Sequence, residues 1–141
     1  MQNSMTLRFS ALSENESFAR AAAGAFLARL DPTMGELAEI KTAVSEAVTN
    51  AIVHGYGGDG TRFVELTVSI EGRVAVVSVS DEGKGIADVA KAREPFFTTE
   101  PGTERSGMGF TVMEAFMDTL EVSSQQGRGT TVTMSRAIAG K

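Results

Sequence analysis

Apolar and polar residues alternate strictly from Val64 to Ile70, and no other feature of the chain constrains the fold as much. The apolar residues of this run are Val64, Leu66, Val68 and Ile70. Such alternation places one face of a strand in the core and leaves the other in water. A turn at Glu71-Gly72 and a returning strand over 74–80 complete a predicted hairpin. The apolar face of this hairpin needs a second layer to cover it.

An amphipathic helix upstream of the hairpin is predicted to form that second layer. Thr33 and Glu36 have the spacing of a capping box, and the helix they begin runs to about His54, where Gly55 closes it. Its apolar residues recur every three or four positions and predict one buried stripe: Ile40, Val44, Ala47, Val48 and Ala51.

Weaker patterns predict the other elements. A strand is expected over 5–10, and Ser13 and Glu16 predict a capping box for a helix with one apolar face. That face consists of Phe18, Ala22, Ala25 and Phe26. Downstream we expect a short helix over 87–92, a helix over 108–117, and strands over 120–124 and 130–135. This order predicts an α/β two-layer sandwich, with helices packed on one face of a mixed, mostly antiparallel sheet.

The composition excludes several classes of function. The 141 residues include 18 acidic and 13 basic side chains, and the net charge of -5 without a basic stripe disfavours nucleic-acid binding. The absence of cysteine and the single histidine, His54, exclude disulfide frameworks, thiolate metal sites and two-histidine zinc sites. No apolar run approaches the roughly 20 residues of a membrane span, and no signal peptide is evident. We therefore expect one cytoplasmic domain over 1–141, without membrane contact.

A row of polar residues borders the buried stripe of the long helix. Glu46, Asn50 and His54 lie four residues apart and share one edge of that stripe. Taken alone, such a row commonly does no more than hydrogen-bond neighbouring backbone groups.

Two glycine patterns follow later in the chain. Asp81 ends the second hairpin strand and is followed by Gly83 and Gly85, which allow a backbone to approach a ligand closely. Gly107 and Gly109 open the next helix, where unpaired N–H groups and the helix dipole favour phosphate. Each pattern has a simpler explanation, because Asp and Gly are common in turns and glycines give a flexible helix start.

Taken in order, these patterns and Gly129-Thr130-Thr131 resemble the four sequence boxes of the GHKL ATPase superfamily, which includes gyrase, heat-shock chaperones and histidine kinases. The match spans about residues 40–133 and implies the Bergerat ATP-binding fold. Across nearly the whole chain, the sequence is similar to the anti-sigma F factor family of endospore-forming bacteria. The similar stretches are 13–20, 30–34, 44–56 and 105–110. A histidine kinase fits less well, because the only histidine lies in the first box.

The resemblance implies a serine kinase with ATP and Mg²⁺ as cofactors. In that family pattern, Asp81 accepts a hydrogen bond from the adenine amino group, with Thr130 in support. Asn50 coordinates Mg²⁺ through its amide oxygen, which suits a hard cation. Glu46 is the catalytic carboxylate for the attacking hydroxyl.

The resemblance also implies an ATP lid over 93–107. Phe96 and Phe97 anchor one end of this lid, and closure over the phosphates excludes water. The other nucleotide contacts that the resemblance implies are Gly83, Gly85, Thr98, Arg105, Gly107, Met108 and Gly109.

Protein partners are implied as well. Arg20 and Glu104 are expected to contact a sigma factor and a small anti-anti-sigma protein, whose serine is the phosphorylation site. Residues 1–30 are expected to mediate a homodimer and partner binding. Two alternatives stay open: a nucleotide-gated module that sequesters a sigma factor with little turnover, and a related serine kinase of general stress signalling. The turn over 57–60 has no assigned role.

Overall fold

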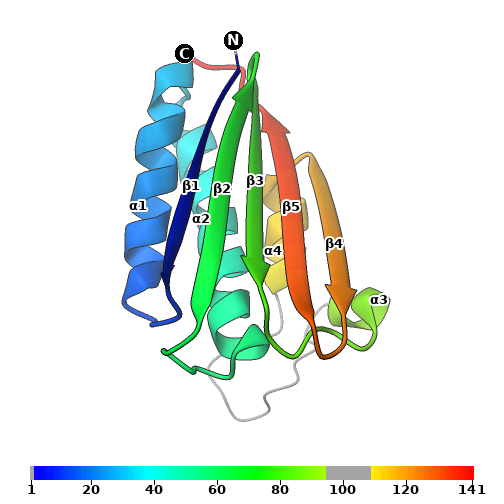
Figure 1. The fold of residues 1–141 in the computed structure, drawn as a ribbon. Helices are drawn as coiled ribbons and strands as arrows, with labels where there is room; N and C mark the ends of the chain where they lie inside the picture. Colours follow the sequence, from blue (N-terminus) through cyan, green and yellow to red (C-terminus); the bar gives the residue numbers. More distant parts are fainter. Residues whose placement is uncertain (1, 95–108) are drawn as a thin grey trace.

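The computed structural model describes residues 2–94 and 109–141, which form a sheet covered on one face by helices (Figure 1). The strands are β1 (Gln2–Ser10), β2 (Phe63–Glu71), β3 (Val74–Asp81), β4 (Thr119–Gln125) and β5 (Gly129–Ala137). The helices are α1 (Asn15–Leu27), α2 (Met34–Asn50), α3 (Val89–Ala92) and α4 (Gly109–Phe116), with a 3₁₀ turn over Ala28–Leu30 and a π-helical turn over Ala51–Gly55. The predicted two-layer α/β sandwich is confirmed.

The five strands lie in the order β1-β2-β3-β5-β4. Every neighbouring pair among them is antiparallel, so the sheet is not mixed as expected. The path of the chain explains this: α4 runs back along the sheet, so β4 starts at the same end as β3 and β5 returns between them (Figure 1). The same path brings the end of β3 beside the start of β5, where Asp81 pairs with Thr130.

The core lies between the sheet and the helices, with α2 in contact with both α1 and α4. The four apolar residues of the alternating run in β2 are fully buried, which confirms the predicted strand: Val64, Leu66, Val68 and Ile70. The predicted stripe of α2 is buried over its whole length, from Ile40 to Ala51. Each large apolar side chain removed from water in this way contributes about 1.5–3 kcal/mol.

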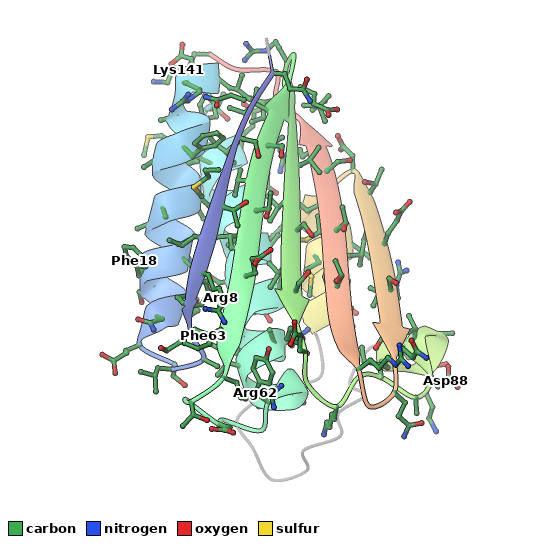
Figure 2. All side chains as sticks on the ribbon, viewed as in Figure 1. Arg8, Phe18, Arg62, Phe63, Asp88 and Lys141 are labelled. Carbon is green, nitrogen blue, oxygen red and sulfur yellow. The ribbon has the colours of Figure 1, made fainter. Side chains whose placement is uncertain are left out.

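Helix α1 differs from its prediction in two respects. The Ser13–Glu16 capping box does not form: the N-cap is Glu14, without a side-chain cap, and the Asn15 side chain donates to the carbonyl of Ser10 at 2.9 Å. The buried face is also different, because it consists of Ala19, Ala23, Gly24 and Leu27. Phe18, expected on the apolar face, is 56 % exposed (Figure 2).

Close packing between α1 and α2 accounts for the exposed phenylalanine. A Cβ at Gly24 would lie only 3.1 Å from Cδ of Lys41 on α2. A side chain at position 24 would therefore press on Lys41, and small residues occupy most of the buried face: Ala19, Ala23 and Gly24, with Leu27 beyond them. The larger Phe18 is therefore directed away from α2.

The second predicted capping box, between Thr33 and Glu36, is present. The Glu36 carboxylate accepts a hydrogen bond from Thr33 N–H at 3.0 Å, and also from the N–H groups of Ala139 and Gly140 at 2.7 and 3.0 Å. These bonds, led by the one from Thr33, lower the pKa of Glu36 from 4.5 to about 2. The carboxylate therefore ties the end of the chain to the start of α2.

We expect the stability of the protein to depend on Glu36 at acidic pH. Because its pKa is lower in the folded state, Glu36 stabilises the fold above about pH 4.5, and this contribution is lost as the pH falls towards about 2. Glu36→Gln should therefore flatten the acid limb of the stability curve, as measured by urea unfolding across this range. Glu121→Gln, at an exposed position on β4, is the matched control. An acid limb that Glu36→Gln left unchanged would contradict this account.

Candidate functional site

A cavity of about 450 Å³ opens between the end of α2, the short α3, the start of α4 and one end of β3 and β5. Its size falls in the range of small-molecule and cofactor sites. Apolar side chains line much of it, and polar groups converge from several elements: Asn50, His54, Asp81, Lys84, Asp88, Lys91, Gln126 and Thr130. Asp88, which lines the cavity, lies beside α3 (Figure 2). The predicted polar row, the Asp81 loop and the start of α4 thus meet in one place.

Glu46 and Asn50 converge at the first residue of α4. A Cβ at Gly109 would lie 3.2 Å from Asn50 Oδ1 and 3.3 Å from Glu46 Oε2. Any larger residue at this position would press on both side chains. Both are half-buried, and Asn50 lines the cavity while Glu46 borders it. A carboxylate and an amide are therefore held side by side at the start of a helix.

The helix that carries this pair ends differently from its prediction. The α-helix stops at Asn50, and a π-helical turn continues over Ala51–Gly55. Tyr56 N–H donates to the carbonyl of Ala51 at 3.1 Å, a bond across five residues instead of four. Such wide turns are frequent at functional sites. Here the turn brings His54 and Gly55 to the cavity wall.

Asp81 lies at the buried end of β3, and its carboxylate forms part of the cavity wall. Burial raises its pKa, while hydrogen bonds from the backbone of Gly83 and Thr130, together with the charge of Arg62, act in the opposite direction. The bond from Gly83 N–H to Oδ1 is 2.9 Å long. Val79 and Val132 also line the cavity. A carboxylate beside apolar walls is suited to accept a hydrogen bond from the amino group of a planar base.

The glycines after Asp81 serve the protein's own backbone. A Cβ at Gly83 would lie 1.9 Å from the carbonyl oxygen of Gly55, and one at Gly55 would lie 2.7 Å from the Asp81 carboxylate. Gly85 has a φ of +74° and would meet the carbonyl of Gln125 at 2.3 Å. These close contacts occur within the protein, and Gly85 also lines the cavity, so the approach of Gly83 and Gly85 to a ligand stays a prediction. The contacts bring the loop after β3 against both the end of α2 and the β4–β5 turn.

Sequence reasoning did not single out Ser124. Its Oγ lies 2.8 Å from Thr130 Oγ1, accepts from Ile86 N–H at 2.7 Å and donates to the carbonyl of Gly129 at 3.1 Å. It therefore connects β4, β5 and the loop after β3 behind the cavity. One signal was available: Ser124 is polar at an inward position of the alternating strand, after Leu120 and Val122.

Arg20 is placed differently from an ordinary solvated arginine. It is half-buried between α1 and α2 and donates to Ser45 Oγ at 3.3 Å. Ser45 directly precedes Glu46. The other predicted contacts lie outside the described residues: Phe96, Phe97, Thr98, Glu104, Arg105, Gly107 and Met108, with most of the predicted lid.

The donor atoms at the cavity fit Mg²⁺ held together with phosphate. Within residues 2–94 and 109–141, no group of three or more acidic or histidine side chains could hold a metal ion. The Asn50 amide oxygen is a hard donor at the cavity wall. Mg²⁺ often binds through few protein ligands, with phosphate oxygens and water completing its shell. Asn50 is thus suited to be such a ligand.

Among the helices of the described residues, none is long and apolar enough to cross a membrane.

Comparison with known sequences points to one family. The family described as "Histidine kinase-like ATPase domain" matches residues 9–136. The anti-sigma F factor of Geobacillus kaustophilus (strain HTA426) is 59% identical over 139 residues, which cover 99% of this chain and 95% of the relative. The anti-sigma F factor of Bacillus licheniformis is 52% identical over the same shares of both chains.

Solved structures agree in fold. The RsbU and RsbW domains of a Mycobacterium tuberculosis protein superpose with a TM-score of 0.69 at 22% identity, covering 96% of this chain and 32% of that longer one. The catalytic domain of the histidine kinase ThkA superposes with a TM-score of 0.58 at 16% identity, covering 95% of this chain and 96% of the other. At these identities the likeness concerns the fold alone.

Proposed function

The chain belongs to the histidine kinase-like ATPase domain family, with anti-sigma F factors as full-length relatives, and on this premise we propose that it is an anti-sigma factor and a protein serine kinase. It binds a sigma factor of the sigma F type in the cytoplasm. With Mg-ATP it phosphorylates a serine of an anti-anti-sigma antagonist, which inactivates that antagonist. The observation that carries the proposal is the convergence of Glu46 and Asn50 on Gly109, at a cavity that also exposes Asp81.

Asp81 and Thr130 supply the adenine end of the proposed site. The Asp81 carboxylate accepts a hydrogen bond from the adenine amino group, supported by Thr130 on the neighbouring strand. Guanine presents a carbonyl oxygen at the same position, so the carboxylate would face an acceptor and lose its partner. That mismatch favours ATP over GTP.

Glu46 and Asn50 supply the phosphate end. Asn50 provides an oxygen ligand for Mg²⁺, which when bound neutralises phosphate charge. Glu46 accepts the proton of the attacking serine hydroxyl while the serine oxygen bonds to the γ-phosphorus and the bond to ADP breaks. Gly109 leaves room for both side chains beside the start of α4.

Phosphate transfer from labelled ATP tests the proposal directly. We expect the purified protein, with γ-labelled ATP and Mg²⁺, to label a small protein on serine in a lysate of its source cells, and Glu46→Ala to label it about 10²- to 10⁴-fold more slowly. Measurable ATP binding without any transfer would contradict the kinase and favour a nucleotide-gated module that sequesters a sigma factor.

Residues 93–107 are proposed to form the ATP lid, with Thr98, Arg105, Gly107 and Met108 as nucleotide contacts and Glu104 as a partner contact. Support for these roles comes from sequence resemblance. A related serine kinase of general stress signalling would share the ATP site and differ in its partner surfaces. The sigma factor recovered with the protein distinguishes the two.

The first 30 residues are proposed to mediate a homodimer and partner binding. Two features support this. Strand β1 lies at the edge of the sheet, and an edge strand invites pairing with a further strand. Phe18 on α1 and Leu12 just before it are 56 % and 41 % exposed, so both side chains are available for apolar contact with a second protein.

Arg20 is the testable partner contact on α1. We expect Arg20→Ala to weaken retention of the sigma factor or the antagonist at least severalfold in a pull-down. Because Arg20 donates to Ser45 beside Glu46, ATP affinity is measured in parallel and should stay unchanged. Arg29→Ala, which removes an arginine stacked on Phe26 at 4.5 Å, is the control. Full retention of both partners by Arg20→Ala would refute the contact.

A further inference from the structure

The hydroxyl of Tyr56 joins two separate segments next to Asp81. It accepts a hydrogen bond from Glu82 N–H at 2.7 Å and donates to the carbonyl of Phe63 at 2.6 Å. Glu82 directly follows Asp81, and Phe63 is the first residue of β2. One side chain thus connects the end of the α2 segment with β2 and with the loop that follows β3.

Arg62 binds the backbone of Glu82 as well, at the carbonyl of the next peptide unit. Its guanidinium donates to the carbonyl of Glu82 at 2.8 Å and stacks over the Tyr56 ring at 4.8 Å from the centroid. Figure 2 shows Arg62 at the end of the sheet where β2 begins. Both polar groups of the Glu82 backbone are therefore bound by two side chains that also pack on each other.

The glycine-rich turn over 57–60 makes this arrangement possible. Gly57 and Gly58 have φ values of +61° and +81°, and Asp59 accepts hydrogen bonds from the N–H and hydroxyl of Thr61 at 3.0 and 2.6 Å. Positive φ favours glycine, because a Cβ would clash with the backbone. The turn reverses the chain within a few residues, so that Arg62 returns over the ring of Tyr56.

Two backbone contacts complete the connection to the cavity. Lys84 N–H donates to the carbonyl of Gly55 at 2.9 Å, and Gly83 lies in direct contact with that carbonyl. Together with the two hydrogen bonds of Glu82, these contacts attach each of residues 82–84 to the segment 55–62. A carboxylate at the end of a strand can point in several directions, and this attachment restricts it.

We propose that Tyr56 and Arg62 are positioning residues for nucleotide selectivity: by binding the N–H and the carbonyl of Glu82, they hold Asp81 in the orientation that recognises the amino group of adenine. This inference rests on the proposed function, since it assigns Asp81 to the base. It also gives the turn over 57–60 its role. Arg62 also supports recognition of the adenine amino group through its positive charge, which favours the ionised form of Asp81.

The test compares ATP with purine riboside triphosphate, which lacks the 6-amino group. The native protein should bind ATP more tightly than this analogue. Tyr56→Phe keeps the ring and removes only the hydroxyl, and should lower ATP affinity roughly tenfold, the value of about one hydrogen bond. Affinity for the analogue should change little, so the ratio of the two affinities falls. Arg62→Gln should reduce the ratio in the same direction.

Thr67→Val is the matched control, because it removes a hydroxyl that lies 3.1 Å from Thr6 Oγ1 on the open face of the sheet, away from Asp81. It should leave both affinities unchanged. A general loss of structure would weaken both ligands equally, whereas misplacement of Asp81 weakens ATP alone. A native affinity ratio in both Tyr56→Phe and Arg62→Gln would overturn the inference. If the native protein bound neither ligand, the proposed function itself would fail.

Discussion

Replacing Glu46 by alanine is expected to lower the rate of phosphate transfer about 10²- to 10⁴-fold while ATP affinity stays nearly unchanged. The first effect follows from the loss of the base that accepts the serine proton. The second follows from position: Glu46 borders the cavity at Gly109 but does not line it, whereas Asn50 does. Since charge neutralisation and positioning supply most of the catalysis of phosphoryl transfer, a residual rate should remain.

Single-turnover transfer from labelled ATP and calorimetric ATP binding measure the two effects separately. Glu39→Ala is the matched control on the same helix, because it removes a glutamate whose partner is Arg136 at 3.1 Å. Loss of a partly exposed ion pair costs at most about 1 kcal/mol, so transfer should persist. A fall in ATP affinity for Glu46→Ala as large as that for Asp81→Asn would rule out the proposed role.

Asp81→Asn is expected to reduce ATP affinity about 10- to 100-fold without unfolding the protein. A hydrogen bond to a buried carboxylate is stronger than one to a neutral amide, and the amide can turn its own donor towards the adenine amino group. The fold should tolerate the change, because burial already disfavours the charge of Asp81. Affinity for GTP should fall less than affinity for ATP, so the ratio of ATP affinity to GTP affinity should decrease.

The pH dependence of binding gives a second readout of the same residue. Since burial raises the pKa of Asp81, the carboxylate of the native protein becomes protonated at a higher pH than an ordinary aspartate. ATP affinity should therefore decline as the solution becomes acidic, and this decline should be weaker in Asp81→Asn. Asp31→Asn, at an exposed position outside the cavity lining, is the control and should keep the native profile. Native ATP affinity in Asp81→Asn would contradict base recognition by this residue.

The local patterns of the sequence predicted the elements well, because the period of each pattern follows from the geometry of a single helix or strand. The alternation over 64–70 and the stripe of α2 both appear as buried faces. Asn50 and Asp81, chosen from spacing and resemblance, both lie on one cavity wall. For these features, the residues of one helix or strand were enough to predict which side chains are buried and which line the cavity.

The predicted apolar face of α1 was wrong, because the face that is buried depends on the element that packs against the helix. Phe18, Ala22 and Phe26 form an apolar row, but the buried row consists of Ala19, Ala23, Gly24 and Leu27. Which row is buried depends on how α1 packs against its neighbours, and at Gly24 that neighbour is Lys41 of α2. The pattern of α1 alone contains no such information.

The sequence by itself determined the two layers, the polar row on α2 and the positions of the glycines. Only the tertiary structure decided what those glycines contact, that Ser124 supports Thr130, and that Tyr56 and Arg62 bind the backbone of Glu82. The reason is physical: periodicity is a local property of the backbone, whereas a hydrogen bond between residues 26 positions apart exists only once sheet register and helix packing bring them together.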